Sequence, residues 1–152
     1  MRAALIALTL TFATQAGGAD IFDSNFSLGN VSGIEVVLED HVSNGCWTNL
    51  REVRKYAEEK LRMKGAKIKK VGLPLLINNN YWFGISVGGG RVFEDLKGDC
   101  YGVISVSLYS LGAFGNIDHK AIIAETSTVL LTKTKLNTAV LEVTNEFISE
   151  LK

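Results

Sequence analysis

The sequence has little of the residue types that most catalytic and metal sites need. Its 152 residues include two histidines, two cysteines and one proline. So few histidines and cysteines leave few ways to build a histidine-rich zinc site or a Ser-His hydrolase. One proline and 47% hydrophobic residues indicate regular structure around a core and exclude a disordered chain. The formal net charge is zero, so overall charge favours no particular partner.

A long apolar run occurs only at the N-terminus. Met1 and Arg2 precede the segment AALIALTLTFA and then TQAGGAD, which is the pattern of a secretory signal peptide. Its apolar core of about 11 residues is much shorter than the roughly 20 that a membrane-spanning helix needs. We therefore expect cleavage after Ala19, with Ala16 as the second choice. The mature protein is then periplasmic or secreted and has no transmembrane anchor.

The mature chain has the length of one domain. Removal of residues 1–19 leaves about 133 residues, enough to bury a core. Residues 20–32 are polar and contain glycine, so we expect an extended lead-in. Residues 33–152 are expected to form a single α+β domain.

Hydrophobic periodicity predicts the elements of this domain. Apolar residues at helical spacing predict two helices, over about 50–64 and 138–151. Asn49 and Glu52 make a capping box at the start of the first helix, and Gly65 stands where its last turn ends. Alternation or β-branched residues predict strands over 33–40, 66–77 (broken near Pro74), 81–87, 100–111 and 121–132.

The element order β-α-β-β-β-β-α predicts the fold class. We expect an α+β, two-layer sandwich with a mostly antiparallel sheet of four to five strands and two helices on one face. Ser105, Ser107, Thr126 and Thr128 are expected on the uncovered face, which meets water or a partner. In element order alone, the chain is similar to the small α+β modules of bacterial envelope assembly factors, such as the amino-terminal domain of the TolB type. That resemblance concerns the fold and does not fix a function.

The two cysteines predict a disulfide. An even pair of cysteines in a small secreted domain is usually bridged, and both Cys46 and Cys100 are expected at the ends of elements. Cys46 lies in HVSNGCWTNL, a stretch that also holds His41, and Trp47 is expected to pack beside the bridge. His41 follows Glu39 and Asp40, which could accompany it in a catalytic site, but we expect it to be an ordinary surface or loop histidine.

The glycine-rich run SVGGGRVFEDLKG predicts a flexible connection. It matches neither the dinucleotide-binding nor the P-loop glycine motif, and Glu94, Asp95 and Asp99 do not have the spacing of an EF-hand loop. We therefore expect no cofactor and no metal.

Two surfaces are candidates for partner contact. Adjacent Tyr81, Trp82 and Phe83 must point to both faces of a strand, which puts Trp82 on the uncovered side. A basic block provides further candidates in Arg51, Arg54, Lys55 and Arg62, although an ordinary solvated helix face with pairs such as Glu58 to Arg62 also explains it. Three acids accompany nine cations in this block: Arg51, Arg54, Lys55, Lys60, Arg62, Lys64, Lys67, Lys69 and Lys70.

The sequence favours a non-catalytic periplasmic or secreted binding or assembly module. It would act through its open sheet face and basic helix surface on an envelope protein, a glycan or an anionic lipid, and no nucleic acid is expected. One alternative is a small secreted hydrolase that uses His41 with Glu39, Asp40 or Asp99. Another is a secreted enzyme inhibitor that presents the 88–99 loop.

Overall fold

The structure is a computed structural model that describes residues 26–31, 33–43, 45–69, 81–91, 100–114, 117–130 and 136–152. The expected signal peptide, the break near Pro74 and the acids Glu94, Asp95 and Asp99 lie outside these residues. The elements in chain order are η1 (Leu28–Asn30), β1 (Ile34–Val42), α1 (Leu50–Met63), β2 (Tyr81–Arg91), β3 (Cys100–Phe114), β4 (Ile117–Leu130) and α2 (Leu136–Glu150).

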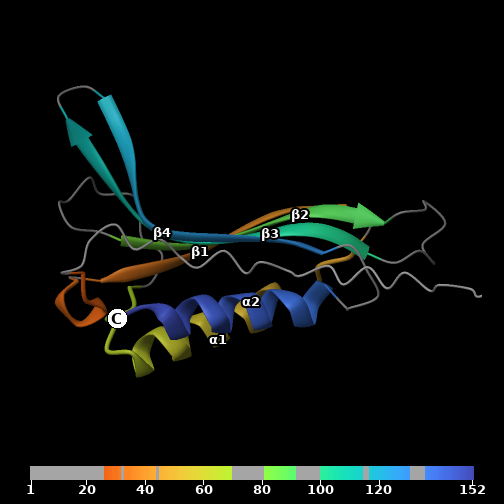
Figure 1. The fold of residues 1–152 in the computed structure, drawn as a ribbon, viewed down its shortest axis with the longest axis horizontal. Coiled ribbons are helices and arrows are strands. Elements are labelled where there is room, and N and C mark those ends of the chain that lie inside the picture. Colours follow the sequence, from red (N-terminus) through yellow and green to blue (C-terminus); the bar gives the residue numbers. More distant parts are fainter. Residues whose placement is uncertain are drawn as a thin grey trace, which may run out of the picture.

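The described elements form two layers, a sheet and a pair of helices (Figure 1). The strand order is β1-β2-β3-β4, with β1 parallel to β2 and the other neighbours antiparallel. Both helices lie on the same face of the sheet, so the α+β sandwich prediction is confirmed. Of the fifth expected strand, residues 66–69 are described and contribute a parallel bridge between Ile68 and Ile34.

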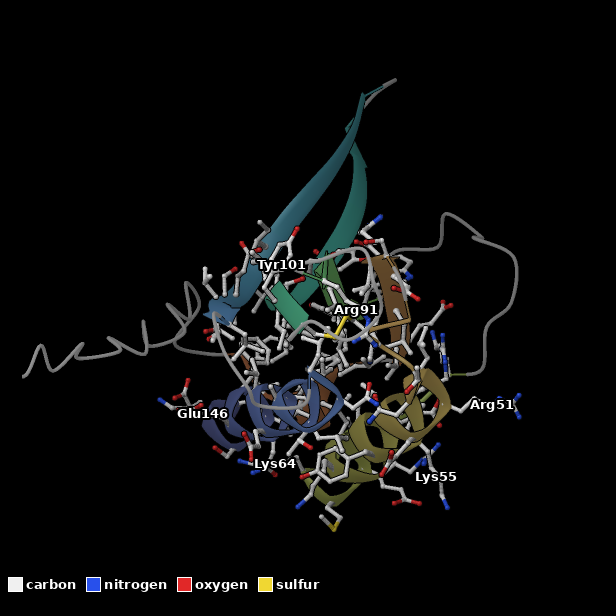
Figure 2. The ribbon with its side chains drawn as sticks, turned by 90° about the vertical axis from the view of Figure 1, so that its right-hand side faces the viewer. Arg51, Lys55, Lys64, Arg91, Tyr101 and Glu146 are labelled. Atoms are coloured by element: carbon white, nitrogen blue, oxygen red, sulfur yellow. A yellow bond between two sulfur atoms is a disulfide. The ribbon has the colours of Figure 1, made fainter. Side chains whose placement is uncertain are left out.

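The core fills the space between sheet and helices (Figure 2). The strand register places Val36, Phe83 and Leu108 side by side on the covered face, and all three side chains are buried. Phe83 meets Phe147 of α2 edge to face, with ring centroids 5.8 Å apart. These contacts join the sheet to α2 because each element presents its apolar side to the other.

Helix α1 begins and ends close to the expected residues. Its C-terminus is a Schellman motif in which the Gly65 amide donates to Arg62 O and the Ala66 amide donates to Leu61 O. Gly65 has φ 91°, a conformation that suits glycine. The prediction of a capping box is wrong. The Asn49 side-chain amide donates a hydrogen bond to the Glu52 carboxylate at 3.2 Å, and the Asn49 side chain makes no cap bond to the helix backbone.

The segment before β1 is not simply extended. Leu28–Asn30 form a 3-10 turn, and the Leu28 side chain is fully buried in the core. The Leu28 amide donates to Lys152 O at 3.0 Å, so this turn lies against the end of the chain. A buried leucine draws the segment inward, which the polar composition of residues 20–32 does not indicate.

The prediction of a flexible connection is wrong for the first part of the glycine-rich run. Residues Gly88–Arg91 continue strand β2. Gly89 has φ 149°, and a side chain there would collide with the Tyr101 carbonyl oxygen of β3. Glycine permits this close approach between the two backbones because it has no Cβ. Residues 92–99 of the expected loop are not described.

Strands β3 and β4 extend beyond their neighbours as a two-stranded arm. A register shift lies between Leu108 and Tyr109, and irregularities of this kind bend a strand. Figure 1 shows the far parts of β3 and β4 turning away from the helices. The sheet is therefore covered by helices on one side and bordered by the arm on the other.

Candidate interaction surface

The uncovered side of the sheet presents a continuous face, which we call the open face. Each strand contributes alternate residues to it, and the register aligns them in rows across the sheet. The members are Glu35, Val37, Glu39, His41, Trp82, Gly84, Ser86, Gly88, Val103, Ser105, Ser107, Tyr109, Ile122, Glu125, Ser127 and Val129.

An aromatic pair forms one end of the open face. Trp82 and Tyr109 are cross-strand partners whose rings stack at 6.0 Å between centroids with planes 15° apart. Tyr109 lies over Gly84, where an added Cβ would come within 3.1 Å of the tyrosine ring. The prediction that Trp82 faces away from Phe83 is confirmed. Tyr81 lies on the other side and packs edge to face on Phe26 at 5.8 Å, which removes it from the open face.

Apolar side chains occupy the opposite end of this face. Val103 and Val129 are cross-strand partners there, 45% and 62% exposed, whereas Ile122, 40% exposed, pairs with Tyr109 at the aromatic end. The two valines, left this far in water on neighbouring strands, form a patch that a partner would cover favourably.

Hydroxyl groups line the middle of the open face. Ser105 and Ser127 are cross-strand partners with their hydroxyls 2.8 Å apart. The expectation that Thr126 and Thr128 share this face is wrong, because they pair with Val106 and Ile104 on the covered face. The threonine-rich strand has no apolar alternation strong enough to show its inner side, so only pairing with β3 settles it.

The environment of Tyr109 combines burial with negative charge. Burial raises the pKa of Tyr109 above its ordinary value of 10.0, and the charges of Glu39 and Glu35 raise it further. Both carboxylates belong to β1 on the open face. The phenol therefore stays protonated and able to donate a hydrogen bond at neutral and mildly alkaline pH.

Because the pKa of Tyr109 is raised in the folded chain, the free energy of unfolding is expected to fall at alkaline pH. Below about pH 10 the phenol is neutral in the folded and unfolded chains alike, and its contribution is fully present. As pH rises through the folded pKa, the unfolded chain loses the proton first, so the free energy of unfolding falls. We expect Tyr109→Phe to reduce that fall, measured by urea unfolding at about pH 9 and about pH 10.5. Equal pH dependence in both proteins would contradict the assignment.

His41 lies on the open face near the end of β1 and is exposed. Its Nε2 is 4.0 Å from Glu39 Oε2, with 68% and 52% of the two side chains in solvent. Asp40 instead accepts a hydrogen bond from the Val42 amide at 3.0 Å. An exposed pair lacks the water-excluded surroundings that strengthen acid-base catalysis. Within the described ranges, no group of three or more His, Cys, Asp or Glu side chains could hold a metal ion.

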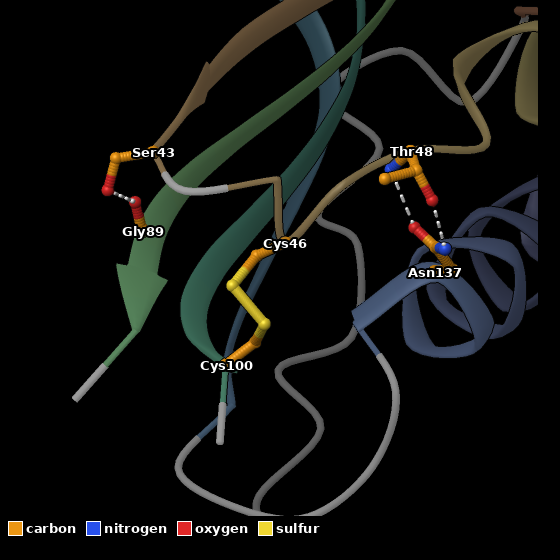
Figure 3. Close-up of a disulfide and its surroundings, with 6 residues drawn as sticks. All are labelled: Ser43, Cys46, Thr48, Gly89, Cys100 and Asn137. Atoms are coloured by element: carbon orange, nitrogen blue, oxygen red, sulfur yellow. Dashed lines mark hydrogen bonds between the residues drawn. A yellow bond between two sulfur atoms is a disulfide. The ribbon is translucent and has the colours of Figure 1, made fainter. Parts of the chain in front are cut away.

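The connection from β1 to α1 is fixed at three points (Figure 3). The Ser43 amide donates to Gly89 O at 3.0 Å, and Cys46 is bonded to Cys100. The Thr48 amide donates to Asn137 Oδ1 at 2.9 Å, and Asn137 Nδ2 donates to Thr48 Oγ1 at 2.8 Å. The disulfide prediction is confirmed. The connection therefore holds β2, β3 and α2 together at one end of the sandwich.

Trp47 follows Cys46 in the sequence, and its side chain is buried in the hydrophobic core. It is 4% exposed, and its indole Nε1 has no hydrogen-bond partner among the residues that the structure describes. The residue therefore acts through packing, as the sequence indicates.

The basic block divides into structural and surface cations. The Arg54 guanidinium donates to the Val36 carbonyl oxygen, and the Lys64 ammonium donates to Ser149 O and Leu151 O at 2.7 and 2.9 Å. Arg51, Lys55 and Arg62 are exposed. Lys55 pairs with Glu59 at 3.8 Å and Arg62 with Glu58 at 3.0 Å, as expected for a solvated helix face. Arg54 is thus tied to the fold and is less available for partner contact than predicted.

Sequence reasoning missed three contributors to the open face, namely Tyr109, Val103 and Val129. For the two residues on β3 a signal was present, because Ile104, Val106 and Leu108 alternate with them and mark the covered side. For Val129 the sequence alone gives no comparable signal, since its strand is placed only by pairing with β3.

Comparison with known proteins shows the fold and no family. No protein-family model matches the sequence, and no curated protein matches it. Among solved structures, a leucine-to-methionine variant of the PelC dodecamer from Paraburkholderia phytofirmans is similar at 14% identity and TM-score 0.50, covering 86% of this chain and 96% of that one. The PelC dodecamer in a second crystal form has TM-score 0.47 at 14% identity and covers 82% and 88% of the two chains. In the described residues, no helix is long and apolar enough to cross a membrane.

Proposed function

We propose that this protein is a non-catalytic binding or assembly module that works in the periplasm or outside the cell. The observation that carries the proposal is the open face, which the helices leave uncovered and on which aromatic and β-branched side chains gather. A face of this kind is typical of protein contact surfaces, because partner contact removes its apolar side chains from water.

The chemistry of the open face favours a neutral or basic partner. Among its described members are three glutamates, Glu35, Glu39 and Glu125, and no lysine or arginine. An envelope protein meets this description best, since valine and isoleucine side chains on strands pack well against another protein. A glycan that stacks on Trp82 is the second candidate, because aromatic rings with nearby hydroxyls and carboxylates suit sugar contacts.

Two further facts support the proposal. Disulfides persist in oxidising compartments, which favours the periplasmic or extracellular location that the N-terminal sequence predicts. The similar PelC structure is a dodecamer, so a domain of this fold can assemble with copies of itself. We infer that self-association is part of the assembly role.

Substitutions on the open face test this function. We expect Val103→Arg with Val129→Arg to reduce capture of a partner from periplasmic or secreted extract by at least about tenfold, because the patch is then charged at its centre. The measurement is affinity capture with the mature protein, quantified by mass spectrometry.

Met63→Arg is the matched control because Met63 is 73% exposed on α1, away from the open face. All three positions are exposed, so both variants are expected to fold, and the two arginines placed opposite each other in the open-face variant cost about 1 kcal/mol at most. Equal capture by the open-face variant and the control would overturn the proposal.

A further inference from the structure

Helices α1 and α2 run parallel at a fixed offset. Thr48 contacts Asn137 and Tyr56 contacts Asn145, each pair 89 residues apart in sequence. At the other end Lys64 contacts Ser149 and Leu151, 85 and 87 residues apart. A residue on α1 therefore lies at the height of the residue about 85–89 positions later on α2.

The outer flanks of this helix pair carry opposite charges. Glu142, Glu146 and Glu150 recur every four residues on α2 and are exposed, and α2 contains no lysine or arginine. On α1 the exposed cations Arg51 and Lys55 are four residues apart, and Arg62 lies seven residues after Lys55. Spacings of four and seven residues correspond to one and two helical turns, so all three lie on one face. Figure 2 shows Arg51 and Lys55 on one side of the helical layer and Glu146 on the opposite side.

The two charged stripes also match in register. With the offset of 89, Arg51 and Lys55 stand at the heights of positions 140 and 144, two residues from Glu142 and Glu146. Arg62 stands within a few residues of Glu150. At about 1.5 Å per residue, the differences in height are only a few ångströms, which the length of an arginine or lysine side chain spans.

We propose that copies of this chain associate head to tail, with the carboxylates of Glu142, Glu146 and Glu150 of one copy against Arg51, Lys55 and Arg62 of the next. The inference rests on the proposed assembly function and names the contact that builds the assembly. α1 packs on β1 and α2 packs on β3 and β4 at the other side of the sheet, so the contact brings opposite edges of two sheets together. Because the two patches differ, one contact leaves the basic patch of the first copy and the acidic patch of the second for further neighbours, and repetition closes a ring or continues as a filament.

The pairs within α1 do not prevent this contact. Lys55 and Glu59 form an exposed i to i+4 pair, and exposed Arg62 pairs with half-buried Glu58; surface pairs of this kind contribute little to stability. Exchange of one carboxylate for another from a neighbour therefore meets little resistance. Contacts between exposed charges are screened by salt, so the assembly is expected to weaken as salt is added.

Charge reversal tests the contact by sedimentation velocity of the mature, disulfide-bonded protein. At about 50 mM salt we expect the wild type to sediment as an oligomer, and at about 1 M salt as a monomer. Glu146→Lys with Glu150→Lys gives two basic flanks, and Arg51→Glu with Lys55→Glu removes the basic one. Each variant alone is expected to be monomeric, and an equimolar mixture is expected to assemble again because unlike flanks then meet.

The design separates failure of the contact from failure to fold. Glu150→Lys and Arg51→Glu each place a favourable charge at a helix end, and recovery in the mixture requires both variants to be folded. Glu39→Lys with Glu125→Lys makes the same change in charge on the open face and is expected to assemble like the wild type. A monomeric wild type at low salt, or either flank variant assembling alone, would overturn this inference, whereas capture through Val103 and Val129 tests the proposed function separately.

Discussion

Removal of the Cys46 to Cys100 disulfide is expected to lower the free energy of unfolding by about 4 kcal/mol in the chain-entropy model. The bridge closes a loop between residues 54 apart, so the reduced unfolded chain gains many conformations that the oxidised one lacks. The measurement is urea unfolding of the mature protein with and without reductant, followed by tryptophan fluorescence, to which buried Trp47 contributes.

The double variant Cys46→Ser with Cys100→Ser provides the control for this experiment. It should unfold at the midpoint of the reduced wild type, and reductant should not change that midpoint. Unfolding midpoints that coincide for oxidised and reduced wild type would show that the bridge contributes nothing to stability.

Gly89→Ala is expected to cost about 2–6 kcal/mol, from backbone strain of about 1–3 kcal/mol and overpacking of a similar size. Gly89 has φ 149°, and an added Cβ would collide with Tyr101 O and lie 2.7 Å from Gly102 Cα. Both obstacles are backbone atoms of β3, so neither can move without disturbing the sheet. Thermal and urea unfolding would measure the loss.

Gly88→Ala is the matched control in the same strand. An added methyl group at Gly88 meets no atom of the described residues within 4 Å. We expect a change in the free energy of unfolding of less than about 1 kcal/mol there, in keeping with substitutions at open surface positions. If both alanine variants were equally stable, the close packing of β2 on β3 at Gly89 would be wrong.

Most helices and strands could be predicted from the sequence because their patterns are local. The stripe of Val53, Ala57 and Leu61 indicates both α1 and its buried side, and the structure buries all three residues. Gly65 likewise marks the end of α1, since a left-handed residue is favourable there. The disulfide could be predicted because the sequence holds two cysteines, which allow one pairing, behind an N-terminal segment that predicts secretion.

The errors occurred where the decisive partner is distant in sequence. The local pattern of three glycines at 88–90 indicates a loop. In the structure these residues continue strand β2, because the backbone of β3 approaches too closely for a side chain at Gly89. Thr126 and Thr128 were assigned to the wrong face because their strand has no clear apolar alternation of its own. The sequence likewise gives no sign that the Arg54 guanidinium binds the Val36 carbonyl of the neighbouring layer.

The sequence by itself determined the periodic elements, the α+β class and the cysteine pair, because each depends on the spacing of residue types along the chain. The tertiary structure decided which faces and flanks those elements share. Alternation along a strand shows that its two sides differ, and only the register of β3 with β2 and β4 brings Trp82, Tyr109 and Val129 to one open face. The opposed charges of α1 and α2 are likewise visible in the sequence, but their matching heights depend on side-chain contacts between residues about 89 positions apart.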